Sequence, residues 1–124
     1  MTGKTNNIIK LKIPNNSDYI HLARLVVSGL GNKMNFDFED IKKMKYALSE
    51  MCLFICENCS DSFIEIEFKQ NDKQILFSFN NSCSNNRQEL EKFITAFNID
   101  FYMDKIKVGK KISLAKRLPK TALP

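Results

Sequence analysis

Two short segments in the middle of the chain alternate apolar with other residues at a period of two. The repeating apolar positions are Ile64, Ile66, Phe68, Ile75, Phe77 and Phe79. The intervening sequence QNDK (70–73) is rich in turn-forming residues, so the two segments are predicted to form a β-hairpin. A sheet with one apolar face must bury that face against a second layer. This requirement limits the chain to folds in which helices or another sheet cover the hairpin.

Helical patterns elsewhere in the chain supply that layer. A strand is predicted over residues 9–13, ended by Pro14, and a helix over residues 19–33. Asp37 is a candidate N-cap for a second helix, whose apolar residues recur three and four positions apart. This stripe consists of Ile41, Met44, Leu48, Met51 and Ile55. A helix over 87–97 and a hairpin around Gly109 follow, which gives the order β-α-α-β-β-α-β-β.

We therefore predict a single domain, residues 1–124, of the α/β (α+β) two-layer sandwich class. The sheet should be mixed but mostly antiparallel, with helices on one face. No apolar run approaches the roughly 20 residues that span a bilayer, so no membrane contact is expected. The N-terminal sequence MTGKTNNIIK lacks the apolar core of a signal peptide, and the predicted location is cytoplasmic.

Four cysteines, at positions 52, 56, 59 and 83, are predicted to be reduced thiols that act as small hydrophobic residues. Cys56 and Cys59 form a C-x-x-C motif, but it closes a predicted helix instead of opening one, which argues against redox chemistry. A zinc site would need a second pair of ligands, for which only Cys52, Cys83 and His21 remain. We predict no bound metal.

The net charge of +5 is concentrated near the C-terminus. Residues 104–124 contain seven basic residues and one acid, whereas the first 103 residues carry a net charge of −1. Such a segment could attract nucleic acid or an acidic protein, or it could be the solvated face of a lysine-rich hairpin. We favour the solvated face. No aromatic residue follows Tyr102 to stack on bases, so nucleic acid is not an expected partner.

Residues 13–52, IPNNSDYIHLARLVVSGLGNKMNFDFEDIKKMKYALSEMC, resemble the N-terminal half of a bacterial regulator family. The family is that of the anti-sigma factor/serine-protein kinases of the RsbW type, within the histidine-kinase-like ATPase superfamily. The similar features are a strand ending in Ile-Pro, ARLVVSGL in the first helix and DIKKMKYALSE in the second. The resemblance covers residues 8–80 well and the remainder weakly.

The resemblance also indicates which residues would handle a nucleotide. In the family, an acid on the second helix precedes a magnesium-binding asparagine by four residues; here these positions are Glu50 and Phe54. The adenine-binding aspartate matches Asn81, the following glycine matches Cys83, and the second glycine-rich box is missing. Glu50 is then either a vestigial catalytic base or a structural acid, exposed or paired with Lys45 or Asn58. The structural role is favoured.

The family resemblance implies a homodimer that holds a sigma factor, for which a small anti-anti-sigma protein competes. An arginine on the first helix belongs to that partner surface, and the matching residue is Arg24. We predict an anti-sigma-factor-like regulator that binds one of these partners without nucleotide turnover and without a cofactor. The alternative is an active ATP-dependent serine-protein kinase, which would require ATP and Mg²⁺.

Overall fold

The computed structural model describes residues 7–80 and 87–119. Its elements follow the predicted order, with two additional short helices, η1 and α4. In chain order they are β1 (Asn7–Pro14), η1 (Ser17–Tyr19), α1 (Ile20–Lys33), α2 (Phe38–Asn58), β2 (Phe63–Gln70), β3 (Gln74–Asn80), α3 (Arg87–Ala96), α4 (Ile99–Tyr102), β4 (Lys105–Val108) and β5 (Lys111–Arg117).

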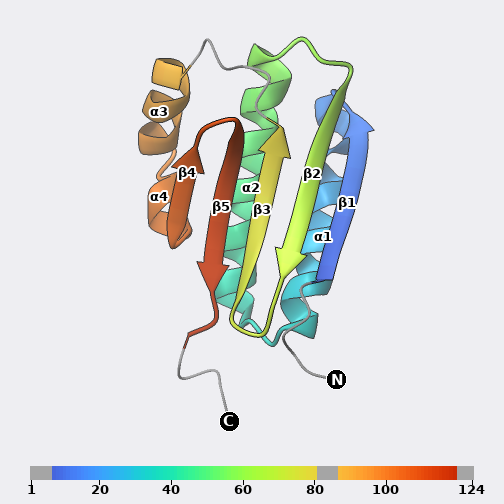
Figure 1. The fold of residues 1–124 in the computed structure, drawn as a ribbon, viewed down its shortest axis with the longest axis vertical. Coiled ribbons are helices and arrows are strands. Elements are labelled where there is room, and N and C mark those ends of the chain that lie inside the picture. The colour runs from blue at the N-terminus through green and yellow to red at the C-terminus, as the bar shows by residue number, and fades with distance from the viewer. Residues whose placement is uncertain (1–6, 81–86, 120–124) are drawn as a thin grey trace.

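The strands form one sheet in the order β1-β2-β3-β5-β4. Every strand pair in the described residues is antiparallel, so the sheet shows no parallel pairing there. Helices α1 and α2 lie behind the sheet, and no described helix or strand covers the opposite sheet face (Figure 1). The predicted two-layer α+β sandwich with helices on one face is therefore confirmed. The mixed character predicted for the sheet, however, is not found in the described residues, because each strand pairs in the opposite direction to its neighbours.

The core lies between α2 and the inner face of the sheet. Phe68, Phe77 and Phe79 alternate inward from β2 and β3, and all three are fully buried. The predicted stripe of α2 meets them, since Met44, Leu48 and Met51 have no measurable exposure. Side chains of this size each contribute about 2–5 kcal/mol when buried in a well-packed core.

The start of α2 is fixed by its cap and by a buried ion pair. Asp37 caps the helix as predicted, since its Oδ1 accepts a hydrogen bond from the Asp40 amide at 2.8 Å. Lys116 points inward from β5, and its Nζ lies 3.8 Å from Asp40 Oδ1, with both side chains about nine-tenths buried. The same ammonium donates to the Tyr102 carbonyl at 3.2 Å. One lysine thus joins α2, α4 and β5.

Some local features differ from the sequence-based predictions. Helix α1 ends at Lys33 as predicted, but it begins at Ile20, because Tyr19 belongs to the short helix η1 that precedes it. The helix predicted over 87–97 ends at Ala96, and Asn98, with a left-handed φ of 58°, starts the separate helix α4. Asparagine tolerates this conformation better than most residues, which explains the break.

The cysteine prediction holds in part. Cys52 is buried and free, and Cys56 is half-buried and free. Burial raises the pKa of the Cys56 thiol, and the carboxylate of Glu57 adds to this shift, so Cys56 is a weak nucleophile. Cys59 is disulfide-bonded, so the prediction of reduced thiols is wrong at that position. Cys59 follows α2 as its C-cap residue with extended backbone, which frees its side chain from the helix.

No helix within residues 7–80 and 87–119 is long and apolar enough to cross a membrane. The same part of the chain contains no group of three His, Cys, Asp or Glu side chains that could hold a metal ion.

We predict that Gly29→Ala and Gly31→Ala have opposite effects on stability. A Cβ at Gly29 would meet no atom within 4 Å, whereas at Gly31 it would lie 2.7 Å from Ile41 Cγ1 on α2. Alanine gains about 1 kcal/mol over glycine inside a helix, but overpacking costs about 1–3 kcal/mol. Urea unfolding should show Gly29→Ala stabilised and Gly31→Ala destabilised. Equal stabilisation of both variants would contradict the close approach of α1 to α2.

We also predict that Lys116→Met destabilises the fold by about 3 kcal/mol, because it leaves the Asp40 carboxylate buried without a counter-charge. Lys111 on the same strand is exposed and lies 4.0 Å from Glu67, so Lys111→Met serves as the control and should cost less than about 1 kcal/mol. Adding Asp40→Asn to Lys116→Met should recover part of the loss. Equal losses for the two lysine variants in urea unfolding would contradict a structural role for the buried pair.

Candidate functional site

Tyr46, Glu50 and Phe54 lie along one face of α2, because each follows the previous one by four residues. The opposite stripe of the helix is held in the core, so this face is turned away from the central sheet contacts. Glu50 and Phe54 are the two positions that the family resemblance indicates for the acid and the metal-binding residue. The structure places them one helical turn apart.

Glu50 is half-buried. Within the described residues its carboxylate makes no hydrogen bond or ion pair, so neither of the predicted pairings, with Lys45 or with Asn58, is present. The Asn58 amide donates instead to the Phe54 carbonyl at 2.9 Å. Partial burial raises the pKa of Tyr46, and the nearby Glu50 carboxylate and Tyr102 add to the shift. The acid therefore lies close enough to Tyr46 to disfavour its phenolate form.

Phe54 is almost fully buried, with 4% of its surface exposed. Its ring centroid lies 4.9 Å from that of Phe93 on α3, and Phe93 lies 4.6 Å from Phe97. The three rings form a continuous series of tilted contacts that joins α2 to α3 and to Phe97, the residue after α3. A phenyl ring offers no oxygen to a magnesium ion, which prefers oxygen ligands. At this position the chain therefore supplies packing where the family supplies a metal ligand.

A second aromatic contact is made one turn before Glu50. The ring of Tyr46 meets that of Tyr102 edge-to-face, with centroids 4.8 Å apart. The Tyr46 hydroxyl donates to the Phe97 carbonyl at 3.1 Å. Together, Tyr46, Phe54, Phe93, Phe97 and Tyr102 form what we call the aromatic wall. It attaches α3 and α4 to α2 on both sides of Glu50, and aromatic pairs of this kind contribute about 0.5–1.5 kcal/mol each.

The aromatic wall was not predicted from the sequence, although its members can be found in retrospect. Phe93 and Phe97 are four residues apart within the helix predicted over 87–97, and Tyr46 and Phe54 are eight apart on the second predicted helix. Asn81, the predicted adenine-binding residue, and Cys83 lie outside the described residues.

The outward side of α1 carries Arg24 together with exposed apolar side chains. Arg24 is exposed, and within the described part of the chain its guanidinium makes no hydrogen bond or ion pair. Leu25 is 64% exposed, and Leu22 and Tyr19 are also exposed on this helix and its entry. We call Tyr19, Leu22, Arg24 and Leu25 the α1 outer surface. Grouped apolar side chains beside an arginine are typical of protein-binding surfaces. Leu22 and Leu25 were missed because they fall outside the core stripe.

Known proteins with similar sequences are named serine-protein kinase RsbW. Those of Bacillus thuringiensis and Bacillus cereus are 32% identical over 101 residues, and that of Bacillus anthracis is 31% identical over the same length. Each match covers 82% of this chain and 57% of the relative, so the chain spans little more than half the length of these relatives. No protein-family model matches the chain. The resemblance found in the sequence is thereby confirmed, and the chain is an RsbW-like protein.

Proposed function

We propose that the chain is an anti-sigma-factor-like regulator that binds a sigma factor or an anti-anti-sigma protein without turning over nucleotide. The observation that carries this proposal is the packing of Phe54 against Phe93, 4.9 Å apart, beside the family-matched acid Glu50. A ring occupies the place where the family resemblance requires a metal-binding side chain.

Phosphoryl transfer depends on metal ions and positioned donors that neutralise charge on the phosphates. The aromatic wall presents ring carbons, and its Tyr46 hydroxyl is already bonded to the Phe97 carbonyl. None of its five side chains carries a positive charge. These residues do not fit ATP·Mg²⁺, and Glu50, which lacks a hydrogen-bonding partner in the described residues, is proposed to be a vestige of a catalytic base.

The partner-binding role is proposed for the α1 outer surface. The Arg24 guanidinium can form two parallel hydrogen bonds with a carboxylate, and the neighbouring Leu25 can enter an apolar pocket of the same partner. We propose that a homodimer presents this surface, as the family resemblance implies. Binding of this kind requires no nucleotide, so it can persist in a protein that has lost the kinase reaction.

The alternative is an active serine-protein kinase, the activity for which the relatives are named. Its support is Glu50, which is present at the position of the acid and remains partly accessible. The two functions differ in one measurable property, the binding of ATP with magnesium.

We predict no saturable binding of ATP·Mg²⁺ by calorimetry at concentrations up to about 1 mM, because Phe54 provides no metal ligand. Phe54→Asn restores an amide oxygen at that position but removes the stacked ring. This variant should still fail to bind ATP, and it should lose at least about 3 kcal/mol of stability. Micromolar binding of ATP by the unmodified chain, with phosphate transfer to a protein serine, would establish the kinase instead.

We further predict that Arg24→Glu and Leu25→Asp each weaken partner binding at least about tenfold, the size of effect expected for a residue central to an interface. The measurement is titration against the sigma factor and the anti-anti-sigma protein encoded in the same genome. Lys92→Glu and Phe101→Asp are matched controls, because both residues are exposed on α3 and α4, on the far side of the molecule from α1 (Figure 1). Unchanged affinity for both α1 variants would exclude this surface.

A further inference from the structure

The sheet face opposite the helices is uncovered and strongly basic. Strand pairing assigns nine charged side chains to this open face, seven basic and two acidic, for a net charge of +5. The basic residues, all exposed, are Lys10, Lys12, Lys69, Lys105, Lys107, Lys111 and Arg117. The acidic residues are Glu65 and Glu67. The net charge of this one face, +5, thus equals the net charge of the whole chain.

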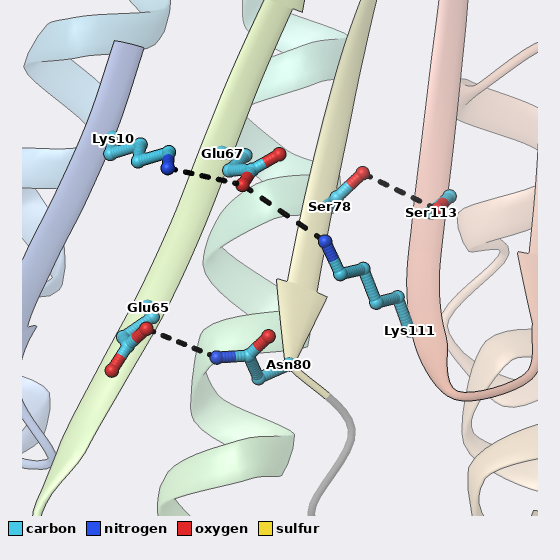
Figure 2. A network of polar contacts seen from close by, with 7 residues as sticks. All are labelled: Lys10, Glu65, Glu67, Ser78, Asn80, Lys111 and Ser113. Carbon is cyan, nitrogen blue, oxygen red and sulfur yellow. Dashed lines mark hydrogen bonds and ion pairs between the residues drawn. The ribbon is translucent and has the colours of Figure 1, made fainter. Parts of the chain in front are cut away.

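The other charges flank an uncharged lane, which one charged side chain, that of Lys111, crosses from β5 to reach Glu67 on β2 (Figure 2). Short or neutral side chains occupy the middle of the face on β3 and β5, and we call this group the open-face lane. Its members are Leu76, Ser78, Asn80, Ser113 and Ala115. Lys10, Lys12 and Lys69 lie on the β1–β2 side, and Lys105 and Lys107 lie on β4. Strands are about 4.8 Å apart, so β1 and β4 bound a strip about 19 Å wide.

Both glutamates on this face are already partnered (Figure 2). Glu67 Oε2 lies 4.0 Å from the ammonium of Lys10 and 4.0 Å from that of Lys111. Glu65 Oε1 accepts a hydrogen bond from Asn80 Nδ2 at 3.1 Å. The Ser78 and Ser113 hydroxyls lie 3.4 Å apart across the lane. Glu67 therefore neutralises part of the charge of Lys10 and Lys111, and neither glutamate pairs with the other cations of the face.

Four cations on this face are left without a charged partner. Within the described residues, the side chains of Lys69, Lys105, Lys107 and Arg117 make no hydrogen bond or ion pair. The contact of Arg117 with Asp104 uses its backbone amide, 2.7 Å from Asp104 Oδ2. Lys12 is different, because its ammonium lies 4.5 Å from the centre of the Phe63 ring. Like charges that crowd one face favour an anionic partner.

We propose that the open sheet face binds an acidic, extended segment of a partner protein, laid along the open-face lane. In an extended chain, alternate side chains are about 6.7 Å apart. Lys105 and Lys107 project from alternate positions of β4 and so repeat at the same interval. Carboxylates of the bound segment reach the unpaired lysines, and the lane's hydroxyl and amide groups meet its backbone.

Other occupants fit this surface less well. A second copy of the chain would bring two faces of charge +5 together, and such like-charge contact opposes association. Single-stranded nucleic acid is held by stacking on aromatic rings. The open-face lane has none, and the exposed Phe63 ring at the end of β2 is already contacted by the Lys12 ammonium. A phosphate backbone would also run across Glu65 and Glu67, whereas a peptide can place neutral residues there. This surface is separate from the α1 outer surface, so the proposal does not rest on the proposed function.

The test uses a fluorescent twelve-residue peptide of alternating Glu and Ser, with the Gln-Ser peptide and a 20-base-pair DNA duplex as comparison ligands. Anisotropy should show saturable binding of the acidic peptide, no binding of the neutral one, and weaker binding at high salt. Lys105→Glu/Lys107→Glu should weaken binding at least about tenfold. Lys42→Glu/Lys92→Glu changes the net charge equally on α2 and α3 and should leave affinity within about twofold.

A second variant tests the lane itself. Ser113→Tyr adds bulk without changing charge, on an exposed strand face that accepts aromatic residues, so the fold should persist. If the peptide lies in the lane, its affinity should fall at least about fivefold through lost contact. Tighter binding of the DNA duplex than of the acidic peptide would overturn the proposal. So would equal losses in the two double variants, an unaffected Ser113→Tyr, or the absence of peptide binding.

Discussion

The packing of α2 against the inner face of the sheet is the contact on which the position of Glu50 and the exposure of the opposite sheet face depend. Met44, Leu48 and Met51 are fully buried against the aromatic side chains of β2 and β3. Because this stripe fixes the rotation of α2 about its axis, Tyr46, Glu50 and Phe54 are directed together toward α3 and α4. The same packing leaves the other sheet face open. The face of α2 that carries Glu50 and the open sheet face thus both follow from the orientation of one helix.

Most of the fold could be predicted because its elements have regular hydrophobic periods. The alternation in β2 and β3 and the stripe of α2 are repeated signals, and Asp37 marks a helix start by its own chemistry. The aromatic wall could not be predicted in this way. It joins Tyr46 to Tyr102 and Phe54 to Phe93, residues far apart in sequence, whose contact depends on how α3 and α4 approach α2. Similarly, the inward direction of Lys116 becomes clear only from the pairing of β5.

The site residues were predicted by resemblance more than by pattern. Glu50 and Phe54 do lie one turn apart on α2, but the packing of Phe54 is what gives the substitution a physical meaning. A nucleotide pocket must stay hydrated and open when empty, whereas a stack of three rings excludes water and adds contact energy. The proposed loss of nucleotide binding would thus exchange a ligand-dependent surface for a permanently packed one, in keeping with the proposed role in partner binding.

Lys116 has a further consequence for the pairing of β5. Within the described residues it is the one cation of β5 that points inward. It follows the inward-pointing apolar residues Ile112 and Leu114 and lies next to the end of the strand. If β5 slipped by two residues against β3, its inward and outward faces would be kept, but Leu114 or Leu118 would replace Lys116 beside Asp40 and leave that carboxylate buried without a counter-charge. The ion pair therefore selects one strand register over its neighbours, and it does so even where hydrophobic alternation alone would tolerate a shift of two.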